Sequence, residues 1–553
     1  MSKNKSVKDI LVLIVVSSLL FLLGNNIISL TNDNEVFYAQ TAKEMIQQNT
    51  WSTPYLFGQP QFEKPIFTYW LLKLSFVIFG VNAFAARFFP AIFGILGVVA
   101  LYFLGLLGFK DRLKAFLSSI ILMSCGMYIG LAKSVFTDMF FSVLIMMSFL
   151  FFFYAYVNQK KKLFGLLSSA ICMGFAVLTK GPLGVLIPFL AVVAFLLIKK
   201  DIRFLFCKET IWSLLVLLLT IAPWYILMIQ KYGNTFINEF ILNDNLRRVT
   251  EAQHGEHDTW YYYPSLIVSG MLPWSLFALG ALIFLCKGLM RKENSFYVFL
   301  VCWIGSVFLI FQAAHSKVAN YIFPIFPPIA LLTGGFIRDI LSNNRYKIIL
   351  YVVLSVISFF VLAVPIALFF SSQKYASYIE NRAGVYFLVA AFLLLAGAIL
   401  FCIYRKKLFP AIYMVGAIVP IFLLSLPLIH NNFEPYISSK YASEYLLSNS
   451  NINNTIICSK TFVRGVKYYT DCDVAVLDMS GKQFFSPHPL TFLSSDEVLR
   501  EFLAKQVITY GVVGKSSVED IKRIAGSDFK VTLLKIIGNE YIIKVEHLEA
   551  QAD

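Results

Sequence analysis

Long apolar segments recur along almost the whole chain and limit the possible folds more than any other feature of the sequence. A helix of about 17 to 25 apolar residues is long enough to cross the hydrocarbon core of a bilayer. Apolar residues make up 58% of the chain and charged residues only 14%. An ordinary soluble domain has fewer apolar and more charged residues than this. The chain is therefore predicted to be a polytopic α-helical membrane protein. Thirteen spans are expected, near residues 9–30, 82–106, 112–132, 134–155, 162–179, 182–198, 210–230, 263–287, 296–313, 319–338, 347–370, 384–403 and 409–429.

The cationic residues lie in short loops between these segments and indicate the orientation of the chain. Loops rich in Lys and Arg stay on the cytoplasmic side of a membrane. The first span follows Lys3, Lys5 and Lys8 and lacks a small-residue cleavage motif, so we expect a retained anchor with a cytoplasmic N-terminus. An odd number of spans then puts everything after about residue 430 outside. The cytoplasmic clusters are Lys110, Arg112 and Lys114; Lys160 to Lys162; Lys199, Lys200, Arg203 and Lys208; Lys287, Arg291 and Lys292; Arg338, Arg345 and Lys347; and Arg405 to Lys407.

The net charge of +15 follows from this topology. A nucleic-acid-binding protein gathers its cations on one face, interleaved with exposed aromatic residues. Here the cations come in small clusters separated by apolar spans, so no nucleic-acid partner is expected.

The last quarter of the chain differs in kind from the rest. Short apolar runs such as TIIC, VAVLDM and EYIIKV alternate there with helical patterns such as SSVEDIKRIAGS. We expect a transmembrane domain over residues 1–430, with outer loops at 31–81 and 231–262, and a small soluble extracytoplasmic α/β domain over 431–553. No phosphate-binding glycine loop or nucleophile elbow occurs in a convincing context, so no nucleotide cofactor is expected. Cys458 and Cys472 could form a disulfide in an oxidising compartment.

The first outer loop is dense in ionisable residues. Asp33, Asn34 and Glu35 follow the first apolar segment, and Glu63 and Lys64 precede the next one, so both groups are expected where a helix meets water. Between them, apolar residues at helical spacing oppose Gln40, Lys43, Glu44 and Gln47. This pattern predicts a short amphipathic helix that lies in the plane of the membrane surface.

Three further charges are expected at the outer ends of spans, namely Asp138, Lys180 and Lys317. A lysine at such a position can simply extend its ammonium into water. A carboxylate gains less from that and more often faces a cavity. Because these unusual charges share one side, we expect a cavity open to the outside.

The second large outer loop brings together carboxylates, cations, imidazoles and aromatic rings. One interpretation is a solvated loop with an aromatic belt. The other is a pocket for an anionic, sugar-bearing lipid head group, because Arg binds phosphate through paired hydrogen bonds and aromatic rings stack on sugars. The residues in question include Arg247, Arg248, His254, His257 and Tyr261.

Several motifs together resemble those of a known superfamily. They are the Trp51-x-Thr-Pro turn, Glu63-Lys64-Pro65, Asp138, Lys180-Gly181-Pro182, Ala222-Pro223-Trp224-Tyr225, the run WYYYPSLIVSGMLPWSLF and the run SKVANYIFPIFP. The chain resembles the bacterial lipid A aminoarabinose transferases and the dolichyl-phosphate-mannose protein mannosyltransferases, which belong to the GT-C membrane glycosyltransferases.

The resemblance implies a glycosyltransferase at the outer face of the bacterial inner (plasma) membrane. The expected donor is a sugar linked to a polyprenyl phosphate of the undecaprenyl type, and the expected acceptor is lipid A, a protein or another glycan. Membrane lipids are expected partners. A second hypothesis is a glycolipid transporter or flippase, although no internal repeat is evident and the polar groups cluster at one face. A third is a non-catalytic scaffold that presents the C-terminal domain.

The resemblance also suggests roles for individual residues. Asp33, assisted by Asp138, is the expected catalytic carboxylate, and Glu35 is the alternative. Strict motif spacing would instead put Asn34 in the catalytic position. A purely structural interpretation is that Asp33 or Asn34 only caps the helix that follows. The expected substrate-binding residues are Asn34, Tyr38, Lys64, Lys180, Arg247, Arg248, Tyr261, Lys317 and Tyr321. The resemblance suggests that Glu63, Asp244 and His254 hold a divalent metal ion. Relatives use a His where this chain has Asp244, so the metal site is left as an alternative.

Overall fold

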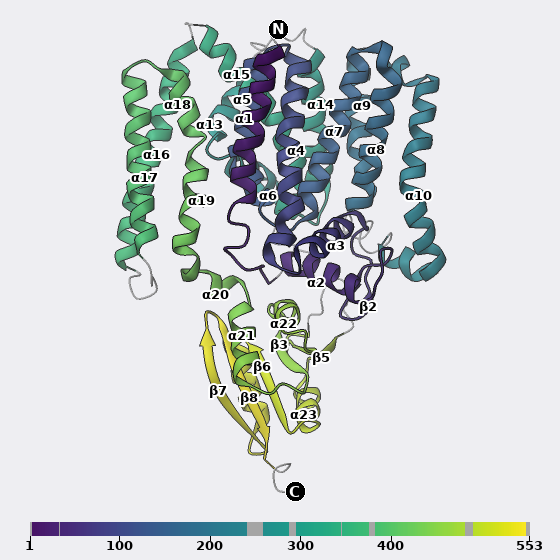
Figure 1. Cartoon of the computed structure of the whole chain (residues 1–553), viewed down its shortest axis with the longest axis vertical. Helices are drawn as coiled ribbons and strands as arrows, with labels where there is room; N and C mark the ends of the chain where they lie inside the picture. Colours follow the sequence, from purple (N-terminus) through teal and green to yellow (C-terminus); the bar gives the residue numbers. More distant parts are fainter. Residues whose placement is uncertain are drawn as a thin grey trace.

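The computed structural model describes residues 3–32, 34–240, 258–286, 295–343, 346–374, 382–481 and 490–548. It consists of a broad layer of long helices with a smaller α/β domain beneath it (Figure 1). The first helix begins at one end of the layer, and the α/β domain lies at the opposite end. Helices of the first outer loop lie between the two.

Each of the thirteen predicted segments contains helix, although the first helix ends at Leu22 and residues 23–30 of that predicted segment are not helical. Nine are single helices: α1 (Lys3–Leu22), α4 (Ala83–Phe109), α7 (Thr137–Val157), α8 (Lys162–Lys180), α9 (Leu183–Ile198), α10 (Lys208–Phe236), α14 (Ser295–Ala313), α16 (Lys347–Lys374) and α17 (Ala383–Tyr404). Four are pairs: α5 (Arg112–Ser124) with α6 (Gly126–Ala132), α12 (Tyr262–Gly270) with α13 (Ser275–Cys286), η5 (Ala319–Ile325) with α15 (Phe326–Ser342), and α18 (Leu408–Val415) with α19 (Ile418–Ile429).

Fewer of the described helices have the length and composition of a membrane span than the thirteen that the sequence predicts. By length and composition, nine of the described helices could span a bilayer, or up to eleven if each strongly bent pair is one span. Helix α9 is short, with 16 residues, and α1 carries Lys5, Lys8 and Asp9 near its start. The protein is a multi-pass membrane protein, and thirteen spans remain a prediction.

Ion pairs tie together the end of the layer where α1 begins. Arg112, at the start of α5, pairs with Asp9 of α1. Lys114 Nζ lies 2.7 Å from Asp339 Oδ1 at the end of α15. The cationic turn at residues 110–114 therefore lies beside the start of α1 and the end of α15.

The first outer loop contains α2 (Asn34–Gln47), the hairpin β1 (Tyr55–Leu56) and β2 (Gln59–Pro60), and α3 (Phe67–Phe79). The predicted short helix is present, but only Gln47 of its four named polar residues is exposed, and Lys43 is half-buried. Gln40 and Glu44 are buried. The Glu44 carboxylate accepts hydrogen bonds from Gln40 Nε2 at 2.7 Å and from the backbone N–H groups of Phe57 and Gly58 at 2.9 Å. The hairpin covers the face that the pattern assigned to water.

The C-terminal domain forms a six-stranded sheet in the order β5-β4-β3-β6-β8-β7. Strands β3 to β6 are mutually parallel where they pair, and β8 runs antiparallel to both β6 and β7. The apolar runs TIIC, VAVLDM, VITYGVVG, KVTLLKII and EYIIKV all contain strands, whereas β5, of only three residues, carries no sequence signal. The strands are β3 (Ile456–Ser459), β4 (Val474–Leu477), β5 (Thr491–Leu493), β6 (Ile508–Val513), β7 (Phe529–Ile537) and β8 (Glu540–His547).

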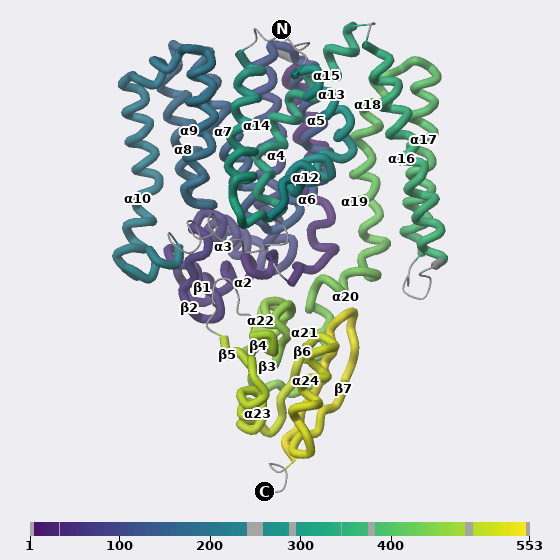
Figure 2. Tube along the Cα trace, turned by 180° about the vertical axis from the view of Figure 1, so that it is seen from behind, coloured from purple at the N-terminus to yellow at the C-terminus, as the bar shows by residue number. Residues whose placement is uncertain are grey.

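Helices of this domain connect it to the spans and cover the sheet. They are α20 (Glu434–Ile437), α21 (Lys440–Asn449), α22 (Val463–Thr470), α23 (Asp496–Ala504) and α24 (Lys515–Ala525). Helix α22 lies directly against α2 of the first loop in both views (Figures 1 and 2). All eight cysteines lie in the described part and none forms a disulfide there, so the pairing of Cys458 with Cys472 that the sequence left open is absent.

Candidate functional site

A buried ion pair joins Asp138 and Lys180 at the ends of two neighbouring spans. Asp138 is in the first turn of α7, and Lys180 is the last residue of α8. A carboxylate at a helix N-terminus and an ammonium at a C-terminus both complement the helix dipole. Lys180 Nζ donates to Asp138 Oδ1, and each side chain is only 7% exposed. The pair is thus held at one end of the helical layer and shielded from water.

Aromatic residues and a second carboxylate surround this pair. Lys180 Nζ lies 4.2 Å from the centre of the Tyr321 ring. Tyr38 of α2 hydrogen-bonds to Thr137, the neighbour of Asp138. Burial, followed by the nearby carboxylates of Asp138 and Glu63, raises the pKa of Tyr38 well above its usual range. These contacts and charge interactions connect five predicted site residues, Tyr38, Glu63, Asp138, Lys180 and Tyr321, which we call the buried cluster.

Lys317 and Asp258 form a second polar group. Lys317 Nζ lies 2.8 Å from Asp258 Oδ1 and donates to the Thr259 carbonyl at 3.2 Å. Tyr261, two residues further on, is 56% exposed. Tyr263 links this group to the buried cluster. Its hydroxyl donates to the carbonyl of Val318, the neighbour of Lys317, at 3.4 Å, and it lies within electrostatic reach of Asp138 and Tyr321.

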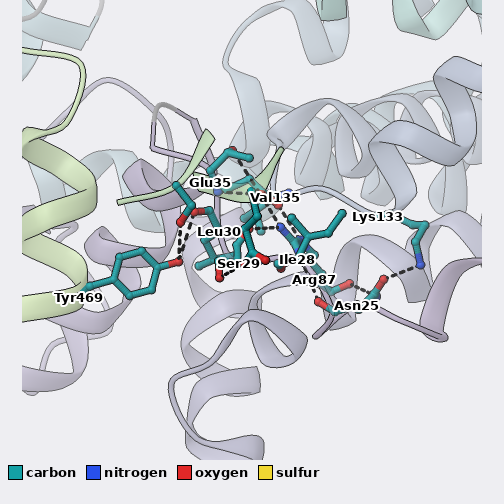
Figure 3. Close-up of polar contacts among 12 residues, drawn as sticks. Asn25, Ile28, Ser29, Leu30, Glu35, Arg87, Lys133, Val135 and Tyr469 are labelled. Carbon is teal, nitrogen blue, oxygen red and sulfur yellow. Dashed lines mark hydrogen bonds and ion pairs between the residues drawn. The ribbon is translucent and has the colours of Figure 1, made fainter. Parts of the chain in front are cut away.

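Glu35 is tied to the protein rather than open to a substrate. Its carboxylate accepts from Arg87 Nη2 at 2.6 Å and from Arg87 Nε at 2.8 Å (Figure 3). The backbone N–H groups of Thr31 and Val135 also donate to it, both at 3.1 Å. With both oxygens occupied by protein donors, Glu35 has the geometry of a positioning residue. The choice between Asp33 and Glu35 as the working carboxylate stays a prediction.

Arg87 is a buried charged residue that was not among the predicted site residues. It lies in the first two turns of α4, is 5% exposed, and also donates to the carbonyls of Asn25, Ile28 and Ser29. An arginine inside an apolar segment is itself a signal, because such a charge is costly without partners. That signal would have found Arg87, although not its partner.

The other predicted residues lie in different settings. Asn34 is exposed at the first position of α2, and Lys64 Nζ donates to the Glu63 carbonyl at 2.9 Å. Asp33, Asp244, Arg247, Arg248 and His254 lie outside the described residues.

The metal hypothesis has one described residue, Glu63. Within the described ranges, no three His, Cys, Asp or Glu side chains form a group that could hold an ion. The carboxylates of Glu63 and Glu239 are close enough to influence each other, an arrangement that a cation would stabilise. Glu239 was not among the predicted ligands.

A cavity of about 740 Å³ opens elsewhere, where the first loop, the turn between α3 and α4, and the C-terminal domain meet. Lys43, Lys440, Phe84 and Tyr469 are among its lining residues. None of the predicted site residues lines it, so it is separate from the buried cluster.

Comparison with known proteins gives matches in sequence and in fold. Residues 8–235 match the family model of the dolichyl-phosphate-mannose-protein mannosyltransferases. An uncharacterized protein of Aquifex aeolicus is 33% identical over 334 residues, which cover 60% of this chain and 64% of that protein. The undecaprenyl phosphate-alpha-4-amino-4-deoxy-L-arabinose arabinosyl transferase of Yersinia pestis is 31% identical over 335 residues, which cover 60% of this chain and 59% of that enzyme. The chain thus spans about three fifths of the length of these relatives.

The fold extends the likeness over nearly the whole chain. The crystal structure of ArnT from Cupriavidus metallidurans bound to undecaprenyl phosphate matches with a TM-score of 0.78 and 18% identity, covering 97% of both chains. The archaeal oligosaccharyltransferase AglB of Archaeoglobus fulgidus matches with a TM-score of 0.51 and 15% identity, covering 94% of this chain and 70% of AglB. The chain is thus similar to the dolichyl-phosphate-mannose-protein mannosyltransferases over its first spans, and it shares the fold of ArnT from end to end.

Proposed function

We propose that this protein transfers a sugar from a polyprenyl-phosphate donor of the undecaprenyl type to an acceptor at the surface of a bacterial inner membrane. The observation that carries the proposal is the buried cluster, in which Asp138 and Lys180 face Tyr38 and Tyr321 beneath the first outer loop. A carboxylate and an ammonium side by side, shielded from water, suit a reaction that moves an anionic leaving group away from a nucleophile. The likeness to the Yersinia transferase supports this class of donor.

The proposed reaction is a displacement at the anomeric carbon of the sugar. An oxygen of the acceptor forms a bond to that carbon while the bond from the carbon to the polyprenyl phosphate oxygen breaks. The polyprenyl phosphate leaves with the bonding electrons as an anion. A hydroxyl acceptor gives up its proton to a carboxylate within hydrogen-bond reach, whereas a phosphate acceptor is already anionic and only needs orientation.

The cations of the site stand on the donor side in this scheme. Lys180 and Lys317 are both paired with carboxylates, Asp138 and Asp258, and both are almost fully buried. A donor phosphate would share each ammonium with its carboxylate, which avoids a buried unpaired charge when the site is empty. Lys64, Arg247 and Arg248 are proposed to add to the donor side from the two outer loops.

The carboxylates stand on the acceptor side. Asp33 is the proposed working residue, and Asp138 assists it. Glu35 is fully engaged by Arg87 and by two backbone N–H groups, so we assign it the role of holding the first loop. Tyr38, Asn34, Tyr261 and Tyr321 are proposed to contact the sugar through hydroxyl, amide and ring surfaces.

The proposed orientation puts the N-terminus in the cytoplasm and the C-terminal domain outside. Supporting this, Arg112, Lys114 and Arg338 gather at the end of the layer where α1 begins, as cytoplasmic loops do. The first outer loop, whose helix α2 carries Tyr38 of the buried cluster, and the C-terminal domain lie at the other end of the layer. A lipid-linked donor suits that side, where nucleotide sugars are not supplied.

A divalent metal ion remains part of the proposal through Glu63, with Asp244 and His254. The Glu63 carboxylate lies close to that of Glu239, and two neighbouring carboxylates repel each other unless a positive charge lies between them. A bound cation would supply that charge. Such an ion would supply a positive charge near the donor phosphate. Elemental analysis of the purified protein and of Glu63→Gln tests this without an activity assay.

Mass spectrometry of envelope glycolipids and glycoproteins from cells with and without the gene tests the proposed function. We expect one sugar-sized mass difference in a lipid, protein or glycan, and accumulation of the polyprenyl-phosphate sugar when the gene is absent. Identical envelope profiles, together with no binding of undecaprenyl phosphate by the purified protein, would overturn the proposal.

A further inference from the structure

The C-terminal domain forms several hydrogen bonds with the short segment that joins α1 to α2. Ser29 N donates to Glu434 Oε1 at 2.8 Å, and the Tyr469 hydroxyl donates to the Leu30 carbonyl at 3.2 Å. Asn32 N donates to the Ile437 carbonyl at 3.0 Å. Three of the four residues 29–32 are thus bonded to residues more than 400 positions away in the sequence.

Asn32 is held most completely. Its side-chain Nδ2 donates to Glu540 Oε1 at 3.2 Å, and its Oδ1 accepts from Ser439 N at 2.7 Å. The Ser439 hydroxyl donates to the same Glu540 oxygen. Asn32, Ser439 and Glu540 are all buried, at 8%, 0% and 1% exposure. We call this group the Asn32 clamp.

Gly465 of α22 closes over the clamp. A Cβ added at this position would overlap Asn32 Oδ1 and approach Ser439 Cβ to 3.0 Å. The absence of a side chain at Gly465 is therefore what lets α22 lie so close to Asn32.

The opposite side of the same segment is held by the membrane domain. Arg87 donates to the carbonyls of Asn25, Ile28 and Ser29, and its partner Glu35 accepts from Thr31 N (Figure 3). The segment is therefore fixed from two sides, by the start of α4 and by the C-terminal domain.

We propose that the C-terminal domain is a positioning element of the proposed catalytic site, and that Asn32, Glu540 and Ser439 set the placement of α2 and of its Tyr38. This inference rests on the proposed function. Asn32 directly precedes Asp33 in the sequence, and α2, which begins at Asn34, carries Tyr38 into the buried cluster. A misplacement of about 1 Å in a reacting group can cost roughly a hundredfold in rate, so a remote hold on this segment has leverage over transfer.

The test compares Glu540→Ala, Glu540→Gln and Asp496→Asn in the full-length protein. Glu540→Gln keeps an acceptor oxygen for Asn32 and Ser439, whereas Glu540→Ala removes it. Asp496 is a carboxylate of the same domain whose pairing with Arg523 is exposed and far from the first loop in sequence and contacts, so Asp496→Asn is the matched control. Two quantities are measured: hydrogen exchange of peptides covering residues 29–38, and sugar transfer followed by mass spectrometry of the envelope.

We expect Glu540→Ala to speed exchange in residues 29–38 and to lower transfer by about tenfold or more, the effect of losing roughly 1.4 kcal/mol of hydrogen bonding at the clamp. Binding of undecaprenyl phosphate and the unfolding temperature of the spans should stay close to those of the parent. Glu540→Gln should restore both quantities, and Asp496→Asn should change neither.

Unchanged exchange in Glu540→Ala would overturn the clamp, and faster exchange with normal transfer would overturn its positioning role. Gly465→Ala provides an independent variant, because it disturbs Asn32 without altering a charge; it should reproduce the Glu540→Ala result. A parent protein that neither transfers a sugar nor binds undecaprenyl phosphate would refute the proposed function instead, and the exchange data would still decide whether the clamp holds the loop.

Discussion

Arg87 and Glu35 form a buried ion pair, 2.6 Å between Nη2 and Oε2, that connects the start of α4 to the start of α2. The side chains are 6% and 3% exposed. The remaining hydrogen-bonding groups of both side chains are engaged by the backbone on either side, from Asn25 to Thr31 and at Val135. The pair therefore orders the chain around the buried cluster, and its value lies in fixing geometry rather than in net stability.

Removing one partner of this pair should be strongly destabilising. Arg87→Met leaves the Glu35 carboxylate buried without its cation, and breaking a buried pair in this way costs about 3–5 kcal/mol. The double variant Arg87→Met with Glu35→Leu should recover much of that loss, because no unpaired charge remains. Thermal unfolding of the detergent-solubilised proteins checks this. Arg523→Ala, which breaks an exposed pair, serves as the control and should change little. A double variant as unstable as Arg87→Met would contradict the account.

Lys180 should bind the phosphate of the donor. Lys180→Met removes the ammonium beside Tyr321 and should weaken binding of undecaprenyl phosphate by about 1.5–3 kcal/mol, the range for hydrogen bonds to a charged group. Because the variant leaves Asp138 unpaired, binding is also measured in Lys180→Met with Asp138→Asn, which removes both charges. Lys231→Met is the control, since this lysine is exposed and its described contact is with Ser52. Parent-like affinity in both Lys180 variants would remove Lys180 from the donor site.

Asp33 and Glu35 should respond differently to neutralisation. Asp33→Asn is expected to abolish sugar transfer and to leave the binding of undecaprenyl phosphate nearly intact, because it changes only the acceptor side. Glu35→Gln should lower the unfolding temperature as well as transfer, because it weakens the pair with Arg87. An active Asp33→Asn protein alongside an inactive, fully stable Glu35→Gln protein would return the catalytic role to Glu35.

The topology can be checked with reporter fusions after Lys162 and after Tyr436. The first position belongs to the cationic end of the layer and the second to the C-terminal domain, so the reporters should lie on opposite sides of the membrane. Reporters on the same side would contradict both the orientation and the outward-facing site.

The sequence was sufficient to predict the class of fold and much of the buried cluster. Span positions followed from apolar length, and Asp138 and Lys180 stood out because a charge at the end of an apolar segment needs a reason. Their partnership with Tyr38 and Tyr321 needed the structure, since these residues come from four separate elements.

Long-range pairing was what the sequence could not supply. Nothing in the local pattern joins Glu35 to Arg87, 52 residues away, or Asn32 to Glu540, 508 residues away. The amphipathic pattern of residues 36–47 led to the wrong environment for the same reason. Its polar stripe resembles a solvated face, and only the folded hairpin shows that Glu44 satisfies backbone N–H groups there.

Glu540 should make the docking of the C-terminal domain depend on pH. Burial raises the pKa of Glu540 from 4.5 to about 7. The hydrogen bonds that Glu540 accepts from Ser439 and Asn32 lower this pKa by a smaller amount. The buried thiol of Cys458 is a second titratable group within electrostatic reach of Glu540. Because the folded protein binds this proton more tightly than the unfolded chain, the contribution to stability is fully present below about pH 4.5 and is lost as the pH rises through 7. The loss amounts to about 3 kcal/mol. Unfolding of the C-terminal domain, measured from pH 5.5 to pH 8.5, should therefore become easier at the upper end in the parent, whereas Glu540→Gln should flatten this dependence and Asp496→Asn should retain it. Equal pH dependence in the parent and in Glu540→Gln would mean that Glu540 does not titrate in this range.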